Sequence, residues 1–167
     1  IFINKMDHPD LSVRATLESL QNLSSHPLVL REIPIREGEK ITGFVDLVSE
    51  RAFRWQEGKP SDLISLPDSV TDREQEARTG MLESLADYDD HLLEELLEDV
   101  VPSSSEVYEN MTKDIQQNLI VPVFFGSAEH DDGIHRLLKA LRHETTGVDA
   151  VIQRLGISGK STSAQVF

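Results

Sequence analysis

The first seven residues combine an apolar run with polar side chains that suit recognition of a nucleic base. Residues 1–3, Ile-Phe-Ile, predict the end of a buried parallel strand, and Asn4-Lys5-Met6-Asp7 follows at its carboxyl end, where open α/β sheets bind ligands. A carboxylate at Asp7 can accept hydrogen bonds from the ring N–H and the exocyclic amine of guanine, whereas adenine offers no such pair of donors. Asn4 can bridge base and protein, and the aliphatic stem of Lys5 can cover the ring.

A second polar segment lies more than a hundred residues further along the chain. Residues 119–125 predict another buried strand, and Gly126-Ser127-Ala128 follows it. We expect the backbone N–H of Ala128 to donate to guanine O6, and the Ser127 side chain to hold Asp7 in place. Together the two segments form the two-part guanine signature of GTPases. For Asn-Lys-x-Asp alone, the alternative is a strand-to-turn junction with a capping Asp.

The stretch between these motifs resembles the GTP-binding domain of bacterial elongation factor G. The resemblance covers almost the whole chain and includes residues 41–48, Ile-Thr-Gly-Phe-Val-Asp-Leu-Val, which are similar to a strand of the insert peculiar to that factor. It implies an α/β fold, namely the C-terminal half of a P-loop GTPase-type parallel sheet with an inserted α+β subdomain. It also implies a cytoplasmic protein that hydrolyses GTP to move tRNA and mRNA on the ribosome.

Three segments depart from the pattern of that factor. Its basic Phe-Lys-Asn-Lys-Gly is replaced by residues 129–133, Glu-His-Asp-Asp-Gly, and its Leu-Pro-Ser-Pro by residues 143–146, His-Glu-Thr-Thr. Residues 58–66 also differ from the usual loop of the insert. These differences favour an elongation factor G-like paralogue whose guanine contacts are kept.

The order of patterns divides the chain into four parts. We expect residues 1–25 and 119–146 to belong to the GTP-binding domain, 26–118 to form the inserted subdomain, and 147–167 to be a linker and the start of a second domain. Since the chain begins in mid-strand without Met, we expect a segment of a longer protein. The phosphate loop, the switch threonine and the Mg²⁺ ligands would precede Ile1, so this chain alone should have no catalytic residue and no GTPase activity.

Apolar spacing and capping residues predict the elements of the insert. Residues 28–35 and 41–48 predict an antiparallel hairpin, 51–55 a third strand, and 56–68 a loop. Three helices should follow, with a capping box from Thr71 to Glu74 and caps at Asp89 or Asp90 and at Ser103. Outside the insert, a helix should start near Pro9 and Asp10, and another after Asp132.

An acidic stretch between the first two of these helices predicts a partner surface. If the helix is continuous, Asp87, Asp90, Glu94 and Glu98 share an outward face, and the leucines at 92, 93, 96 and 97 lie inside. The alternative is a solvated helix face. In elongation factor G the insert contacts the C-terminal domain of the ribosomal stalk protein through acidic helix residues, so the resemblance implies the same for these four.

Two other patterns are weak. Gly159-Lys160-Ser161 resembles the end of a phosphate loop, but Arg154 occupies the position where that loop needs glycine, so we expect a linker. The six histidines are scattered and match no ligand spacing, and we expect no metal site.

The composition narrows the class of partner. The 167 residues carry a formal net charge of −14 and no cysteine. Because phosphate contacts need clustered Lys and Arg, we expect no DNA binding, and no apolar run is long enough to cross a membrane. We expect a cytoplasmic monomer without disulfides. The alternative function is a non-enzymatic acidic module that binds a basic protein; an adenine-nucleotide enzyme is disfavoured by Asp7.

Overall fold

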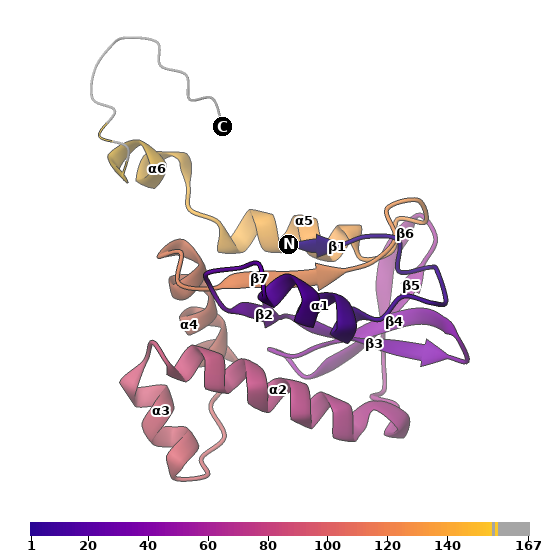
Figure 1. Ribbon diagram of the computed structural model, residues 1–167, viewed down its shortest axis with the longest axis horizontal. Coiled ribbons are helices and arrows are strands. Elements are labelled where there is room, and N and C mark those ends of the chain that lie inside the picture. The colour runs from indigo at the N-terminus through magenta and orange to yellow at the C-terminus, as the bar shows by residue number, and fades with distance from the viewer. Residues whose placement is uncertain (155, 157–167) are drawn as a thin grey trace.

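The computed structural model, which describes residues 1–154 and 156, contains a parallel and an antiparallel sheet (Figure 1). In the parallel sheet, β7 (Val121–Phe125) lies between β1 (Phe2–Ile3) and β2 (Leu28–Leu30). β1 and β2 lie within the first 30 residues and β7 begins at Val121, so the parallel sheet is built from strands on both sides of a long insertion. This arrangement confirms the predicted fold class.

The antiparallel sheet has its strands in chain order: β3 (Glu32–Glu37), β4 (Lys40–Asp46), β5 (Arg51–Gln56) and β6 (Lys59–Ile64). The predicted loop over residues 56–68 is therefore wrong, because β6 lies within it. Gly58, at φ 63°, closes a two-residue turn between β5 and β6. Pro60 is tolerated because β6 is an edge strand with one neighbour.

The single strand predicted over residues 28–35 is also wrong, since the chain changes sheets at Arg31. The Arg31 N–H donates to the Val123 carbonyl of the parallel sheet (3.0 Å), and the Arg31 carbonyl accepts from the Leu47 N–H after β4 (3.0 Å). One residue thus joins the two sheets. The predicted domain boundary at residue 26 stays a prediction, while the change from parallel to antiparallel pairing falls at Arg31.

Six α-helices complete the described fold: α1 (Val13–Gln21), α2 (Thr71–Ala86), α3 (Asp90–Leu97), α4 (Ser104–Gln116), α5 (Ile134–Glu144) and α6 (Val148–Arg154). The Asp89 and Ser103 caps are confirmed, since their side chains accept from the N–H groups of Leu92 and Glu106 at 3.2 Å. One predicted start is wrong, and a second helix starts where predicted but without the predicted capping box. Ser12, not Pro9 or Asp10, caps α1. Thr71 caps nothing, because the short 3₁₀ helix Asp68–Val70 leads directly into α2.

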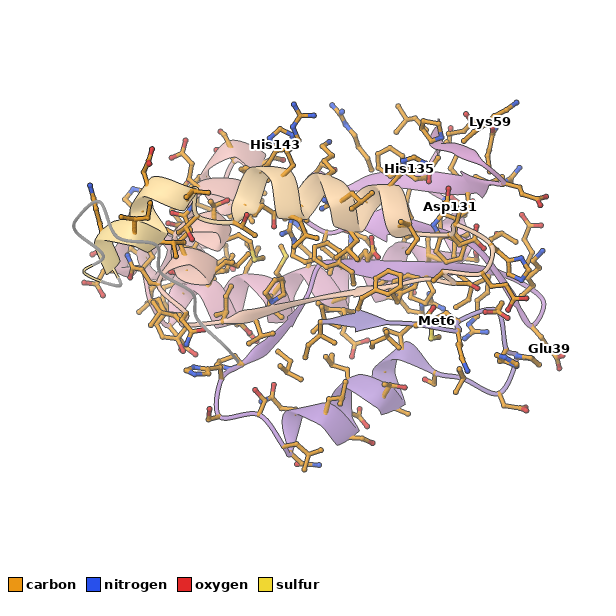
Figure 2. All side chains as sticks on the ribbon, turned by 90° about the horizontal axis from the view of Figure 1, so that it is seen from above. Met6, Glu39, Lys59, Asp131, His135 and His143 are labelled. Atoms are coloured by element: carbon orange, nitrogen blue, oxygen red, sulfur yellow. The ribbon has the colours of Figure 1, made fainter. Side chains whose placement is uncertain are left out.

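Two apolar clusters hold these layers together, with the antiparallel sheet between them. Alternation along β4 divides its side chains: Val45 packs in a cluster with residues of α2, α3 and α4, whereas Phe44 packs with Val123 and Phe125 of the parallel sheet. Figures 1 and 2 show α5 on one side of the parallel sheet and α1 on the other. The carboxyl ends of β1 and β7 are thereby fixed next to each other.

Candidate guanine-binding site

The parallel pairing of β1 with β7 brings the two predicted motifs to one edge of the sheet. Ile3 is in register with Phe125, and the Gly126 N–H donates to the Ile3 carbonyl at 3.0 Å. The ladder continues past the strands, because the Met6 N–H donates to the Gly126 carbonyl at 2.9 Å. Met6 is buried at 1% exposure and pins the loop that carries its neighbours.

Asn4 is the bridge between the motifs. Its side-chain oxygen accepts from the Lys5 N–H at 2.8 Å and from the Ala128 N–H at 2.9 Å. Lys5 has a φ of 63°, a left-handed conformation that the Asn4 bond to its amide stabilises. The predicted contact of the Ala128 N–H with guanine O6 stays a prediction, and this amide would have to be shared with, or released by, Asn4.

Asp7 is set up as a charged acceptor. A hydrogen bond from the Ser127 side chain is the largest of the effects that hold its pKa below the ordinary value, followed by its own backbone N–H. The predicted pairing of Ser127 with Asp7 is consistent with this. The Asp7 side chain is 25% exposed, so the carboxylate can also accept from a ligand.

The loop after β7 has the shape that these contacts need because of two glycines. The N–H groups of Ser127 and Asp132 each donate to the other's carbonyl at 3.0 Å, which closes a tight loop. A Cβ on Gly126 would lie 2.0 Å from the Asp132 carbonyl oxygen. Gly133, at φ 78°, ends the loop and caps α5. Only glycine therefore fits at positions 126 and 133 of this loop.

Two histidines flank Asp7 and were not predicted as site residues. His8 Nε2 lies 3.9 Å and His130 Nε2 lies 4.0 Å from Asp7 Oδ2. The sequence could have indicated His8, which follows Asp7 directly, but not His130, which comes near Asp7 only through the fold of the loop after β7. Figure 2 shows Met6 and Asp131 at the same end of the molecule, where the two loops meet.

The helical segment that carries the predicted acidic face differs from the expectation in two respects, while the role of its four acidic residues stays a prediction. The helix is not continuous: Asp87 is the C-cap of α2, while Asp90, Glu94 and the C-cap Glu98 belong to α3. All four acidic side chains are exposed. Leu92 is buried, but Leu93 and Leu97 are 43% and 76% exposed, so the outer side of α3 is mixed acidic and apolar.

The remaining features lie away from the candidate site or outside the described residues. The glycine-rich segment at 159–161 lies outside the described residues. A cavity of about 440 Å³ between α1 and α2 includes none of the five predicted guanine contacts in its lining. Within the described residues, no helix has the length and apolar content that would let it span a bilayer.

The fold is a parallel half-sheet with an inserted α+β subdomain, the arrangement that the sequence predicted for the C-terminal half of a GTPase-type sheet. No family model matches the chain. It is 40% identical over 158 residues to an elongation factor G-like protein of Synechocystis sp., covering 95% of this chain and 24% of that protein. Elongation factor G of Rhodopirellula baltica is 32% identical over 142 residues, or 84% of this chain and 20% of the relative.

A solved structure agrees at the level of the fold. The crystal structure of a Thermus thermophilus protein matches with a TM-score of 0.76 and 24% identity, over 93% of this chain and 23% of that one. The comparisons confirm the predicted resemblance: nearly the whole chain is similar to part of elongation factor G and elongation factor G-like proteins. It spans about a quarter or less of the length of these relatives.

Proposed function

We propose that this chain is the guanine-recognition part of a translational GTPase of the elongation factor G type. The observation that carries the proposal is the joining of the two motifs, in which Asn4 Oδ1 accepts from the Ala128 N–H across 124 positions of sequence. A strand-to-turn junction at Asn4–Asp7 alone gives no reason for this contact.

The residues present fit a guanine base. Asp7 is charged and partly exposed, so it can accept from the two guanine donors, and Ser127 holds its other side. Lys5 is exposed next to it, where its stem can cover the ring. Adenine would leave the carboxylate unpaired, a discrimination that sites of this kind make strongly.

Hydrolysis needs groups that this chain does not supply. No Gly-x-x-x-x-Gly-Lys or Asp-x-x-Gly segment occurs in its sequence. We therefore assign the phosphate contacts, Mg²⁺ and the attacking water to another part of a longer protein, and expect no GTPase activity from these residues alone. In the whole protein, GTP hydrolysis would be coupled to ribosomal translocation. The higher identity to the elongation factor G-like relative favours a paralogue of the main factor.

A second surface, on α3 of the insert, suits a protein partner. The exposed Glu94 and Glu98 lie on or next to α3 beside the exposed Leu93 and Leu97. Acidic residues around apolar side chains suit a basic protein surface with an apolar centre. We propose that α3 contacts the C-terminal domain of the ribosomal stalk protein.

Calorimetric titration of the whole protein with GDP and with ADP, in Mg²⁺, tests the guanine proposal. We expect tight GDP binding and no measurable ADP binding. Equal affinity for the two nucleotides would contradict the proposal. Binding of neither would favour the alternative, a non-enzymatic acidic module that binds a basic protein.

A further inference from the structure

A second polar cavity, of about 180 Å³, lies where the two sheets meet α4 and α5. We call it the seam pocket. Its lining includes four cationic side chains but only two carboxylates, although the chain as a whole has a net charge of −14. The cations are Arg31, Arg51, Arg136 and Lys139. Ser49 and Tyr108 add two hydroxyl groups to the lining.

Both carboxylates of the seam pocket are already engaged. Asp46 pairs with Arg136 at 2.6 Å and also accepts from the N–H groups of Val48 and Ser49 at 3.0 Å. Glu144 pairs with Arg31 through Nη1 and lies 3.9 Å from Arg136. The acceptor atoms of the two carboxylates are thus largely occupied, whereas three guanidinium nitrogens of the lining have no hydrogen-bond partner among the described residues.

Arg31 is the group that most needs a further partner. Its side chain is 0% exposed, yet its Nε and Nη2 atoms have no hydrogen-bond acceptor among the described residues, and neither does Nε of Arg136. Buried guanidinium donors without acceptors are costly, and a bound anion or water is one arrangement that would satisfy them. The Phe124 ring, 5.5 Å and 5.4 Å from the two guanidinium carbons, holds both groups in place.

The exposed part of the seam pocket's lining is also basic. Arg51 and Lys139 are exposed, and neither makes an ion pair within the part of the chain that the structure describes. Two such cations beside a buried, underused guanidinium provide the charge that would attract a dianion and the fixed donors that would hold it.

We propose that the seam pocket binds a phosphate group, either free or on a small metabolite. None of the five proposed guanine contacts lines this pocket, which is built from the strand junction at Arg31, the turn between β4 and β5, α4 and the body of α5. The proposal is therefore independent of the guanine site. A bound phosphate would link the antiparallel sheet to α5, and so the insert to the parallel sheet.

The test titrates the whole protein with inorganic phosphate by calorimetry, at constant ionic strength and with GDP in excess so that any nucleotide site is filled. The variant Arg51→Ala/Lys139→Ala removes the two exposed cations and leaves the buried pairs intact. We expect it to bind phosphate roughly tenfold or more weakly, with an unchanged thermal midpoint. The matched control Arg54→Ala/Lys59→Ala removes two exposed basic residues outside the pocket and should bind as the wild type does.

Two further arms complete the test. A phosphorylated sugar should compete with phosphate if the natural ligand is a metabolite, and fail to compete if only the free ion fits. Acetate competing as well as phosphate would overturn the phosphate assignment. Equal phosphate affinity of the wild type and the Arg51→Ala/Lys139→Ala variant, or no binding at all, would overturn the site.

Discussion

At the scale of single residues, the candidate site depends on polar atoms that hold each other before any ligand arrives. Asn4 joins the two loops, and Ser127 and two histidines surround the carboxylate of Asp7. Guanine presents two donors and one acceptor, so a carboxylate at Asp7 and a backbone N–H at Ala128 could be predicted as its partners from the motifs alone. The bond between Asn4 and the Ala128 amide could not, since it depends on the register of strands far apart in sequence.

Replacing Asn4 with Ala should loosen the site. The Ala128 and Lys5 N–H groups would lose their shared acceptor, which should destabilise the fold by about 1–2 kcal/mol and weaken GDP binding about tenfold or more. Chemical unfolding and GDP calorimetry measure the two effects. Asn22→Ala, at the exposed C-cap of α1, is the control. Unchanged GDP affinity in Asn4→Ala would show that Asn4 does not support the guanine site.

Glu32 should make stability depend on pH. Burial raises its pKa from 4.5 to about 8, although the Phe125 N–H and the nearby Arg136 and Arg31 favour its charged form and Asp46 opposes it. Between these two values the folded chain keeps a proton that the unfolded chain releases, so stability falls as pH rises.

The variant Glu32→Gln keeps an acceptor for the Phe125 N–H without the titration. Its stability gain over the wild type should be larger at about pH 9 than at about pH 6, by about 1–3 kcal/mol. Urea unfolding at both pH values measures the difference. Glu109→Gln, on the exposed side of α4, should show no such change. An equal gain at both pH values would mean that Glu32 is charged in the fold.

At the scale of elements, periodicity predicted most helices and the strands that carry the site, while element ends depended on tertiary contacts. Residues 28–35 have one continuous apolar pattern, but the burial of Arg31 between two sheets divides them. The leucines of α3 follow helical spacing, yet Leu93 and Leu97 are exposed because α3 packs on one narrow side against α2. Sequence alone does not show which neighbour covers a short helix.

The Asp89 cap should be worth more than its acidic neighbours. Asp89 accepts from the Leu92 N–H and pairs with Lys113 of α4 at 3.1 Å, so Asp89→Ala should cost about 1–2 kcal/mol in unfolding free energy. Asp90→Ala, which removes an exposed carboxylate from the first turn of the same helix, should cost about 0.5 kcal/mol or less. Chemical unfolding of both variants measures these costs. Equal losses of unfolding free energy in the two variants would show that Asp89 is not acting as a cap.

At the scale of the whole molecule, a parallel half-sheet holds the candidate guanine site, and the insert holds α3 well away from it (Figure 1). Two separate surfaces suit a protein that binds nucleotide at one place and a partner at another. The resemblance predicted this division, but the mixed acidic and apolar character of α3 emerged only from the folded chain.

The proposed stalk contact should therefore have two separable components. Glu94→Gln/Glu98→Gln should slow association with the stalk protein's C-terminal domain about three- to tenfold at low salt, with the difference shrinking as salt rises. Leu97→Ser should instead speed dissociation at every salt concentration. Surface plasmon resonance separates the rates. Glu109→Gln is the charge control, and identical rates for all variants would exclude α3 from the interface.

The most direct test of the central claim exchanges the hydrogen-bonding character of residue 7. In the whole protein, Asp7→Asn replaces a pure acceptor with a group that can also donate, which suits xanthine, whose carbonyl replaces the guanine amine. Calorimetry with GDP and xanthosine diphosphate should show a preference for GDP in the wild type and for the xanthine nucleotide in the variant. Unchanged GDP preference in Asp7→Asn would contradict the assignment of Asp7 as the guanine-reading residue.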